Sequence, residues 1–127
     1  MTDDSSKITS IGQIAIPVHD LARATAFYRD VLKIPFLFQA GDLVFFQCGE
    51  TRMMLSLPEA SEFDHPTSLI YYRVDDIDRE FERLISEHVV VVDEPHLIAR
   101  MEDHELWMAF FKDTEGNPFA LMEEYPL

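Results

Sequence analysis

The feature that most constrains this fold is an internal repeat. In each half of the chain, a strand-like segment of alternating apolar residues ends at an aspartate, and an amphipathic helical run follows it. Setting Asp20 on Asp76 also sets Leu21 on Ile77. Each aspartate stands where its carboxylate can accept hydrogen bonds from the free backbone amides of a helix start. This agreement in order and spacing predicts a domain built from two copies of one structural unit.

The segments after each helical run complete the predicted unit. Helices are expected over residues 20–32 and 76–87, and three strand-like stretches bounded by turn residues follow each of them. These stretches cover residues 34–40, 43–48, 52–57, 89–99, 104–112 and 118–123. Each half therefore reads β-α-β-β-β, and the fold class is α+β with two tandem modules. Because a helix covers one face of each sheet, the two remaining faces are expected to pair and enclose a central cleft, where small-molecule sites tend to lie.

The domain organisation follows from the repeat. Residues 1–10 are polar and small, so we expect a flexible tail there, and residues 11–124 are expected to form one domain. Within that domain, module one covers residues 11–57, a proline-containing linker covers 58–67 and module two covers 68–124.

Charge and cysteine content exclude several classes of partner. The formal net charge is −14, from 24 acidic and 10 basic residues. Such a surface repels phosphate backbones and anionic membranes, so neither nucleic acid nor a membrane is an expected partner. The single cysteine, Cys48, excludes an intramolecular disulfide. No apolar run approaches the roughly 18 residues of a membrane span, and the first residues lack the pattern of a secretory signal. A cytoplasmic protein is expected.

Two motifs carry a resemblance to a known superfamily. The first, VHDLARATAFYRDVL at residues 18–32, is similar to a strand-to-helix signature V-x-D-L…F-Y-x-x-x-L. The second, FKDTEGNPFAL at residues 111–121, is similar to a turn F-x-D-P-x-G-N, with Thr114 in place of proline. The chain resembles the vicinal oxygen chelate superfamily, which includes glyoxalase I, extradiol dioxygenases and bleomycin-resistance proteins. The resemblance covers about residues 11–124 and implies the two-module fold, but no single reaction, because the superfamily hosts many.

The resemblance also implies positions for a divalent metal on the inner strands, where it would act as a Lewis acid on adjacent substrate oxygens. The histidine and glutamate ligands of the family match Gln13, Leu69 and Ala120 here, and the fourth position falls near Met54 or Ser56. Leucine and alanine cannot bind a metal ion, and glutamine is an occasional ligand for hard metals. We therefore expect the usual metal site to be lost, with no cofactor bound.

An apolar or aromatic small molecule is the expected ligand of the cleft. Aromatic rings and methionine thioethers suit such a ligand, although the same side chains would equally fill a core. The side chains expected at the cleft are those of Gln13, Phe46, Met54, Tyr71, Arg73, Trp107 and Ala120. At the cleft mouth, Arg73 would clamp a ligand carboxylate or would pair with Asp75 or Asp76.

A second hypothesis is an enzyme, either a glyoxalase-like lyase or isomerase or a dioxygenase-like protein. His96 and His104 flank an expected hairpin turn and Glu105 is close in sequence, so the three would bind a divalent metal or act as acid and base. Alternatively, they are ordinary surface residues of a charged hairpin. A third possibility is a scaffold or regulatory dimer with a vestigial pocket. Open sheet faces and edges favour a homodimer in each case. The remaining histidines, expected to be solvated, are His19, His65 and His88.

Overall fold

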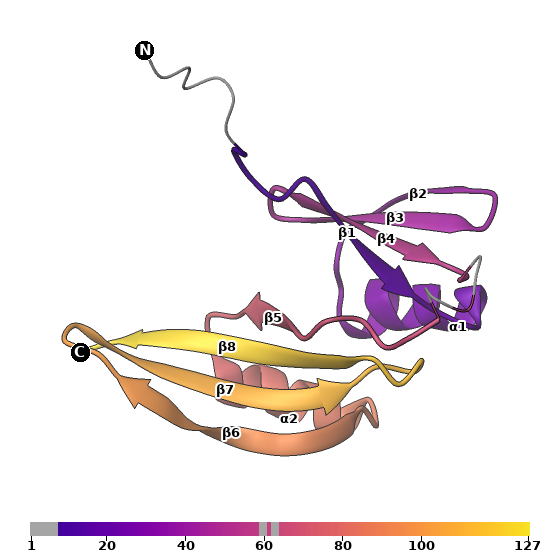
Figure 1. Ribbon diagram of the computed structural model, residues 1–127. Helices are drawn as coiled ribbons and strands as arrows, with labels where there is room; N and C mark the ends of the chain where they lie inside the picture. Colours follow the sequence, from indigo (N-terminus) through magenta and orange to yellow (C-terminus); the bar gives the residue numbers. More distant parts are fainter. Residues whose placement is uncertain (1–7, 59–60, 62–63) are drawn as a thin grey trace, which may run out of the picture.

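The computed structural model describes residues 8–58, 61 and 64–127 (Figure 1). Its elements are, in order, β1 (Gln13–Pro17), α1 (Leu21–Ala26), η2 (Phe27–Val31), β2 (Phe36–Ala40), β3 (Leu43–Cys48), β4 (Thr51–Ser56), β5 (Ile70–Arg73), α2 (Ile77–Ser86), β6 (Val90–Arg100), β7 (His104–Lys112) and β8 (Pro118–Pro126). The order of strand, helix and three strands occurs twice. The expected α+β fold of two tandem β-α-β-β-β modules is therefore confirmed.

Parts of the expected domain organisation fall outside the described residues. The structure does not describe residues 1–7 of the tail expected over 1–10. It also does not describe residues 59–60 and 62–63 of the linker expected over 58–67. The division into tail, linker and modules therefore stays a prediction. Among the residues that the structure does describe, no helix is long and apolar enough to cross a membrane.

The two sheets repeat each other in strand order and in register. The order is β1-β4-β3-β2 in the first sheet and β5-β8-β7-β6 in the second. In each sheet the first and last strands of the module pair in parallel, and the other pairs are antiparallel. Ala15 pairs with Met54 between β1 and β4, and Tyr71 pairs with Ala120 between β5 and β8. Met54 of the first module therefore corresponds to Ala120 of the second.

Both helices begin at the expected aspartates. The Asp20 carboxylate accepts a hydrogen bond from the backbone N–H of Arg23 at 3.0 Å, and the Asp76 carboxylate accepts one from Arg79 at 3.1 Å. Each bond satisfies a backbone donor that has no partner within the helix, which contributes about 1 kcal/mol to stability. The sequence repeat is therefore a repeat of helix starts as well as of strands.

The two helices differ in their middle and agree at their ends. The second keeps regular α-helical geometry over Ile77–Ser86, whereas the first changes to a π-helix over Phe27–Val31. Lys33 follows the first helix with φ at 60°, and His88 follows the second with φ at 63°. Glycine is the usual residue in this left-handed conformation, because a Cβ atom there costs roughly 1–2 kcal/mol.

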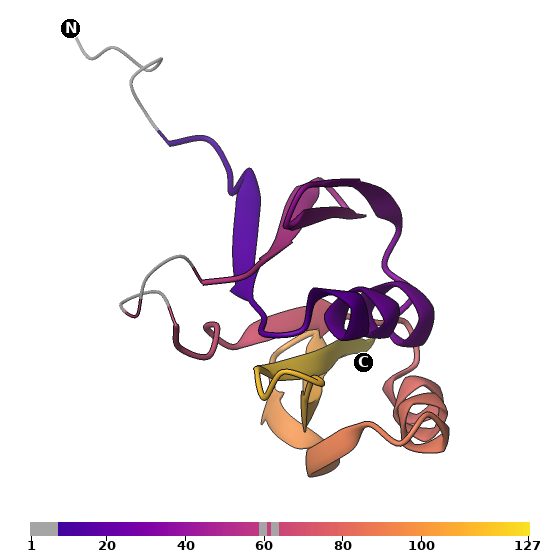
Figure 2. The same ribbon diagram turned by 90° about the vertical axis from the view of Figure 1, so that its right-hand side faces the viewer.

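The helix-covered sides of the two sheets share one hydrophobic core that includes residues of both modules. The ring of Phe27 in η2 lies 6.1 Å from the ring of Phe119 on β8. The hydroxyl of Tyr72 on β5 lies 3.9 Å from the sulfur of Met53 on β4. Figure 2 shows both helices on one side of the two sheets, next to this core. The core therefore joins the modules into one domain.

The open face of each sheet consequently points to the outside of the chain. The sequence predicted that these two open faces pair and enclose a central cleft; the sides that meet within this chain are the helix-covered ones. The physical reason is that the helix-covered sides carry the fully buried rings, such as Phe46 and Phe111, and these sides meet in the shared core. Burying that larger apolar area decides which sides of the sheets face each other.

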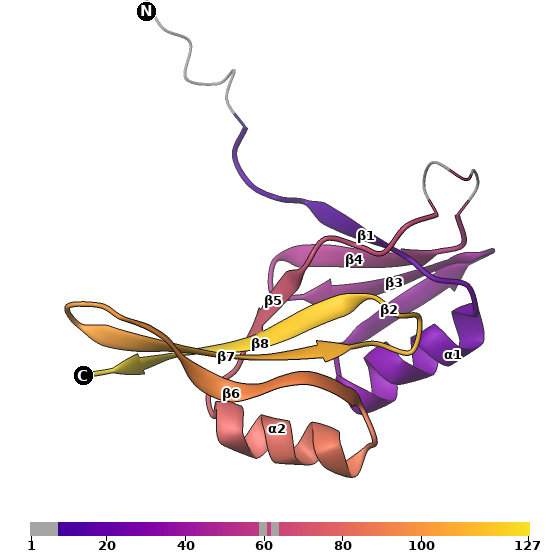
Figure 3. The same ribbon diagram turned by 60° about the horizontal axis from the view of Figure 1, so that its bottom comes forward.

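The turn between β7 and β8 holds the start of α1, and Figure 3 shows the two next to each other. The Glu115 carboxylate accepts hydrogen bonds from the backbone N–H groups of His19 and Asp20, both at 2.9 Å, and from Arg23 Nε at 2.7 Å. Gly116, with φ at 81°, reverses the chain in this turn. Burial alone raises the pKa of Glu115, but these hydrogen bonds outweigh it and lower the pKa to about 2.

A buried polar network lies beside this turn. The Tyr28 hydroxyl donates to the Asp113 carboxylate at 2.6 Å, and the backbone N–H groups of Glu115 and Asn117 donate to the same carboxylate, both at 2.8 Å. Asn117 Nδ2 donates to the Pro17 carbonyl at 2.9 Å. Asp113 and Asn117 are 4% and 2% exposed. The two motifs that resemble the superfamily signatures therefore bind each other across the modules.

Candidate functional site

A hollow of about 790 Å³ lies on the open face of the first sheet. Strand alternation creates it: Ile14 and Ile16 point into the core, so Ala15 and Pro17 point to the open face. The hollow is lined by Ala15, Pro17, Ala40, Asp42, Leu43, Met54, Ser56, Leu57, Pro58 and His65. Its volume lies within the roughly 300–1,000 Å³ of small-molecule sites, and its lining is mainly apolar with a few polar groups, as such sites require.

Gln13 and Arg52 form a polar pair beside this hollow. Arg52 Nε donates to Gln13 Oε1 at 2.7 Å, and Gln13 Nε2 lies 3.8 Å from the Met54 sulfur. The Arg52 guanidinium also lies 5.5 Å from the centre of the Phe45 ring, which stacks on Phe38 at 4.7 Å. Gln13 and Met54 therefore lie together, and their predicted role in binding a ligand stays a prediction. Arg52 was not among the residues predicted for the site, although its position two residues before Met54 in the same strand places both on one face.

The open face of the second sheet carries a cluster of aromatic rings. The rings of Tyr71 and Phe110 meet edge to face at 6.3 Å, and the imidazole of His96 lies 6.1 Å from Phe110. Ala120 pairs with both Tyr71 and Phe110 in the sheet and is fully buried. The structure thus brings together Tyr71, Ala120 and His96, and Ala120 lies beneath the two rings rather than on an empty cleft floor.

A charged group lies on the same face toward the end of β8. Arg73 Nη2 is 2.9 Å from Glu124 Oε1, and His104 Nε2 is 3.8 Å from the other oxygen of Glu124. His104 Nδ1 is also 2.7 Å from Asp103. The sequence alternatives for Arg73 were a ligand carboxylate or a pair with Asp75 or Asp76, and its carboxylate partner in the structure is Glu124.

Two residues predicted at the cleft lie on the other side of their strands. Phe46 is fully buried between the rings of Tyr28 at 6.2 Å and Phe36 at 5.8 Å. Trp107 packs against the core cluster, and its Nε1 donates to Glu105 at 3.1 Å. The placement of both on the open face is wrong. Both strands carry large apolar residues on both faces, and in such a strand a one-residue error exchanges the faces.

The proposed catalytic group is not assembled in the described part of the chain. His96 pairs with Met108 across β6 and β7, whereas His104 pairs with Pro126 across β7 and β8. Glu105 lies on the helix-covered side, where hydrogen bonds from Trp107 and then from Arg100 lower its pKa. Within residues 8–58, 61 and 64–127, no group of three or more His, Cys, Asp or Glu residues is arranged to hold a metal ion.

The residues at the positions that the resemblance implies for metal ligands are not suited to bind a divalent metal ion. The register makes Met54 the counterpart of Ala120, so the set is Gln13, Met54, Leu69 and Ala120. These residues offer one amide, one thioether and two hydrocarbon side chains, and hard divalent metals need oxygen or nitrogen donors. The amide oxygen of Gln13 already accepts a hydrogen bond from the Arg52 guanidinium. The donor set therefore does not fit a divalent ion.

His65 is the imidazole that lines the hollow in the first sheet. The sequence predicted a solvated linker residue, because the linker gives no strand or helix pattern that would place it. Its side chain is exposed, and its Nδ1 lies 2.9 Å from the Pro66 carbonyl. Together with Asp42 and Ser56 it supplies the polar groups of the lining.

Comparison with known proteins identifies relatives of this architecture. The family model described as Glyoxalase/Bleomycin resistance protein/Dioxygenase superfamily matches residues 10–121. A lactoylglutathione lyase from Agrobacterium tumefaciens is 24% identical, with a TM-score of 0.72 over 92% of this chain and 95% of that chain. TnmS3, an antibiotic binding protein from Streptomyces sp. CB03234, is 25% identical, with a TM-score of 0.74 over 92% and 97%. A superfamily member from Sphaerobacter thermophilus DSM 20745 is 24% identical, with a TM-score of 0.77 over 92% and 98%. None of the curated proteins compared matches the chain.

Proposed function

Because the chain belongs to the Glyoxalase/Bleomycin resistance protein/Dioxygenase superfamily, we propose that it binds an apolar or aromatic small molecule without a metal ion. The observation that carries the proposal is the hollow of about 790 Å³, whose lining is mainly apolar. The stacked rings of Phe38 and Phe45 lie on the same sheet, and further rings lie on the open face of the second sheet. Flat apolar ligands gain both burial and ring contacts on such surfaces. The likeness to the antibiotic binding protein TnmS3 supports a binding role.

We further propose that a second copy of the chain completes the site. The open faces expose apolar side chains, with Phe38 at 49% and Tyr71 at 45% exposure. In a twofold dimer, the first sheet of one protomer would cover the second sheet of its partner, and symmetry would form two equal clefts. The net charge of −14 opposes this association, so the contact needs at least roughly 1,000 Å² of buried surface. The cytoplasmic location expected from the sequence stays a prediction.

A lyase or isomerase activity is the second candidate function. The likeness to a lactoylglutathione lyase supports it, as do the three polar side chains in the hollow, those of Asp42, Ser56 and His65. An imidazole titrates near neutral pH and can move a proton. Turnover that disappears in His65→Gln, with ligand binding retained, would favour this candidate over simple binding.

The binding proposal is tested with the neutral aromatic probe N-phenyl-1-naphthylamine. We expect its fluorescence to rise on binding and its affinity to fall about tenfold or more in Ala15→Trp, because the indole fills the hollow. The matched control is Gln39→Trp, which adds the same indole at an exposed position of β2 outside the lining. Equal affinity in the two variants would move the site elsewhere. Stoichiometric metal in the purified protein, with a melting temperature that a chelator lowers, would contradict the metal-free proposal.

The dimer proposal has a complementation test. Ala15→Trp blocks the first sheet and Phe110→Ala removes a ring from the second, so each variant alone has two defective clefts. If clefts form between protomers, mixing the two variants creates mixed dimers with one intact cleft, and probe binding returns in part. Mixtures that bind no better than the average of the separate variants would show that each chain binds alone.

A further inference from the structure

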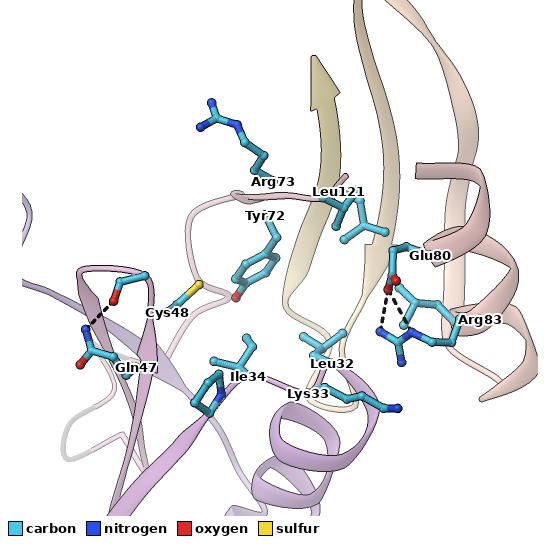
Figure 4. A pocket seen from close by; sticks show the side chains of 14 residues that line it. Leu32, Lys33, Ile34, Gln47, Cys48, Tyr72, Arg73, Glu80, Arg83 and Leu121 are labelled. Carbon is cyan, nitrogen blue, oxygen red and sulfur yellow. Dashed lines mark hydrogen bonds and ion pairs between the residues drawn. The ribbon is translucent and has the colours of Figure 1, made fainter. Parts of the chain in front are cut away.

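A second cavity, of about 260 Å³, lies where the two modules meet on the helix-covered side of the sheets (Figure 4). Both modules contribute its apolar walls, which include Leu32, Ile34, Cys48, Tyr72, Leu84 and Leu121. None of these side chains lines the hollow on the open face. The volume is slightly below the roughly 300–1,000 Å³ of drug-sized pockets. A single ring or a short acyl chain is therefore the size of ligand that fits.

The charge around this cavity is opposite to that of the whole chain. Lys33, Arg73 and Arg83 line it together with one carboxylate among the described lining residues, that of Glu80. The chain as a whole has 10 basic residues and a net charge of −14. In Figure 4, the Lys33 and Arg83 side chains lie at one end of the cavity, whereas the Arg73 side chain points away from it. An anionic ligand would therefore find here a positive site on a negative protein.

Of these three cations, Lys33 is the one available to a ligand. Arg83 Nη2 lies 2.8 Å from Glu80 and its Nη1 donates to the Val31 carbonyl at 2.6 Å, while Arg73 pairs with Glu124. For Lys33, no carboxylate within the described residues lies at ion-pair distance. An ammonium group binds a carboxylate as a compact point charge.

The Tyr72 hydroxyl is a polar group in the otherwise apolar wall of this cavity. Within the described residues, the Tyr72 hydroxyl contacts the weak acceptor Met53 Sδ, at 3.9 Å. Burial raises the pKa of Tyr72, so the hydroxyl stays protonated and can donate a hydrogen bond. Figure 4 shows it near Cys48, whose thiol is half-buried in the cavity wall. A ligand oxygen that reaches this hydroxyl would gain a better acceptor than the thioether supplies.

We propose that this cavity between the modules is a second binding site, for a small molecule with a carboxylate head and a short apolar body. Lys33 binds the head at the mouth. The leucine and isoleucine side chains bury the body, and the Tyr72 hydroxyl contacts any polar group at its inner end. The site is separate from the open-face hollow, and it does not depend on the function proposed for that hollow.

The test uses Cys48, the single cysteine of the sequence, as a reporter inside the cavity. 4,4′-Dithiodipyridine reacts with the thiol, and the released thiopyridone is followed by absorbance. We expect octanoate to slow this reaction at concentrations about fivefold lower than those octan-1-ol requires. This factor corresponds to the attraction between one carboxylate and one ammonium group at contact distance in water. If octanoate leaves the rate unchanged, or protects no better than the alcohol, the proposal is overturned.

Two variants locate the carboxylate. Lys33→Gly removes the ammonium at a backbone position with φ of 60°, where glycine is favoured, so unfolding does not explain a loss of binding. His88→Gly makes the matched change at φ of 63° after the other helix, outside this cavity. Octanoate should protect Lys33→Gly no better than octan-1-ol does, and should protect His88→Gly as well as the parent. Equal protection of Lys33→Gly and the parent would contradict the assignment.

The open-face variant separates this site from the first. Ala15→Trp should keep full protection of Cys48 by octanoate, because Ala15 lines the other hollow. Loss of protection in Ala15→Trp would place octanoate on the open face and would overturn the second site.

Discussion

The two helices start from the same sequence pattern and hold the molecule together in different ways. The second helix lies on its own sheet, and the backbone N–H of Ile77 donates to Glu123 of that sheet at 2.9 Å. The first helix is held by the other module, through Glu115 at its start and Asp113 at Tyr28. A repeat in sequence therefore produces one helix whose start is held by its own module and one whose start is held by the other module.

The π-helix in the first copy fits this joining role. Phe27 and Tyr28 are consecutive, and both are buried, at 5% and 1% exposure. Phe27 contacts Phe119 of the second module, while Tyr28 contacts Phe46 of the first at 6.2 Å and reaches Asp113. A helix packed on one sheet buries one stripe, whereas this segment lies between two sheets and buries neighbouring residues on both sides.

The largest effect is expected from the network that joins the modules. Asp113→Ala leaves the Tyr28 hydroxyl and the backbone donors of Glu115 and Asn117 without their buried acceptor, which should lower the free energy of unfolding by about 3 kcal/mol. Gln47 stands at the matching distance before Met54 in the first module and bonds to the Gly49 carbonyl of its own turn. Gln47→Ala should therefore cost no more than about 0.5 kcal/mol. Urea unfolding measures both, and equal losses would end the distinction between the two turns.

Acid should weaken the contact between the first helix and the β7–β8 turn. The depressed pKa of Glu115, about 2, means that its contribution is present above the ordinary glutamate pKa and is lost as the pH falls toward 2. Glu115→Gln should therefore cost about 2 kcal/mol at pH 7, and this cost should shrink as the pH falls from about 4.5 to 2. Urea unfolding across this pH range measures the effect.

The matched change for the second helix is Glu123→Gln, which weakens the acceptor for the N–H of Ile77. It should cost about 1 kcal/mol. A cost of Glu115→Gln that stays constant down to pH 2 would contradict the role assigned to its carboxylate.

The two helix caps should be equal. Asp20→Ala and Asp76→Ala each remove one side-chain acceptor, for Arg23 and Arg79 respectively. We expect each to lower the free energy of unfolding by about 1 kcal/mol. Denaturant midpoints at constant m-value provide the measurement. A loss for Asp20→Ala much larger than for Asp76→Ala would show that the aspartate also supports the contact between modules.

The smallest effects are stabilising. Lys33→Gly and His88→Gly each place glycine at a left-handed backbone position after a helix. Each should raise the free energy of unfolding by about 0.5–1 kcal/mol and raise the melting temperature accordingly. The two values should agree, because the φ angles at the two positions nearly agree. A gain at only one position would mean that the side chain at the other makes a compensating contact.

The sequence predicted what depends on local pattern. Asp20 and Asp76 marked both helix starts because a cap is a contact between near neighbours, and the alternation of Ile14 and Ile16 marked the buried side of β1. Gln13 and Met54 lie close together because both belong to strands of the same sheet, and their role in binding a ligand stays a prediction. The order of strand, helix and three strands in each half followed from the repeat itself.

The predictions that failed concern features that depend on contacts between distant segments. In LVFFQC and HELWMAFFK, apolar residues point to both faces, so pattern alone did not separate Phe45 from Phe46 or Trp107 from Met108. Which sides of the two sheets meet is decided by the fit of whole surfaces, and no local pattern encodes it. His65 comes from a linker without periodicity, so its place in the hollow was equally invisible.

The contact between the first helix and the β7–β8 turn also bears on the order in which the chain matures on the ribosome. Arg23 and Glu115 are 92 residues apart in sequence, and Tyr28 and Asp113 are 85 apart. During synthesis, the first module cannot make these contacts until the β7–β8 turn has left the exit tunnel. Its aromatic side chains that are buried in the folded domain therefore stay exposed while most of the second module is translated. Long-range closure of this kind also slows folding. A nascent chain halted before residue 113 should therefore keep its first helix accessible to chaperones, even where the strands of the first module have formed.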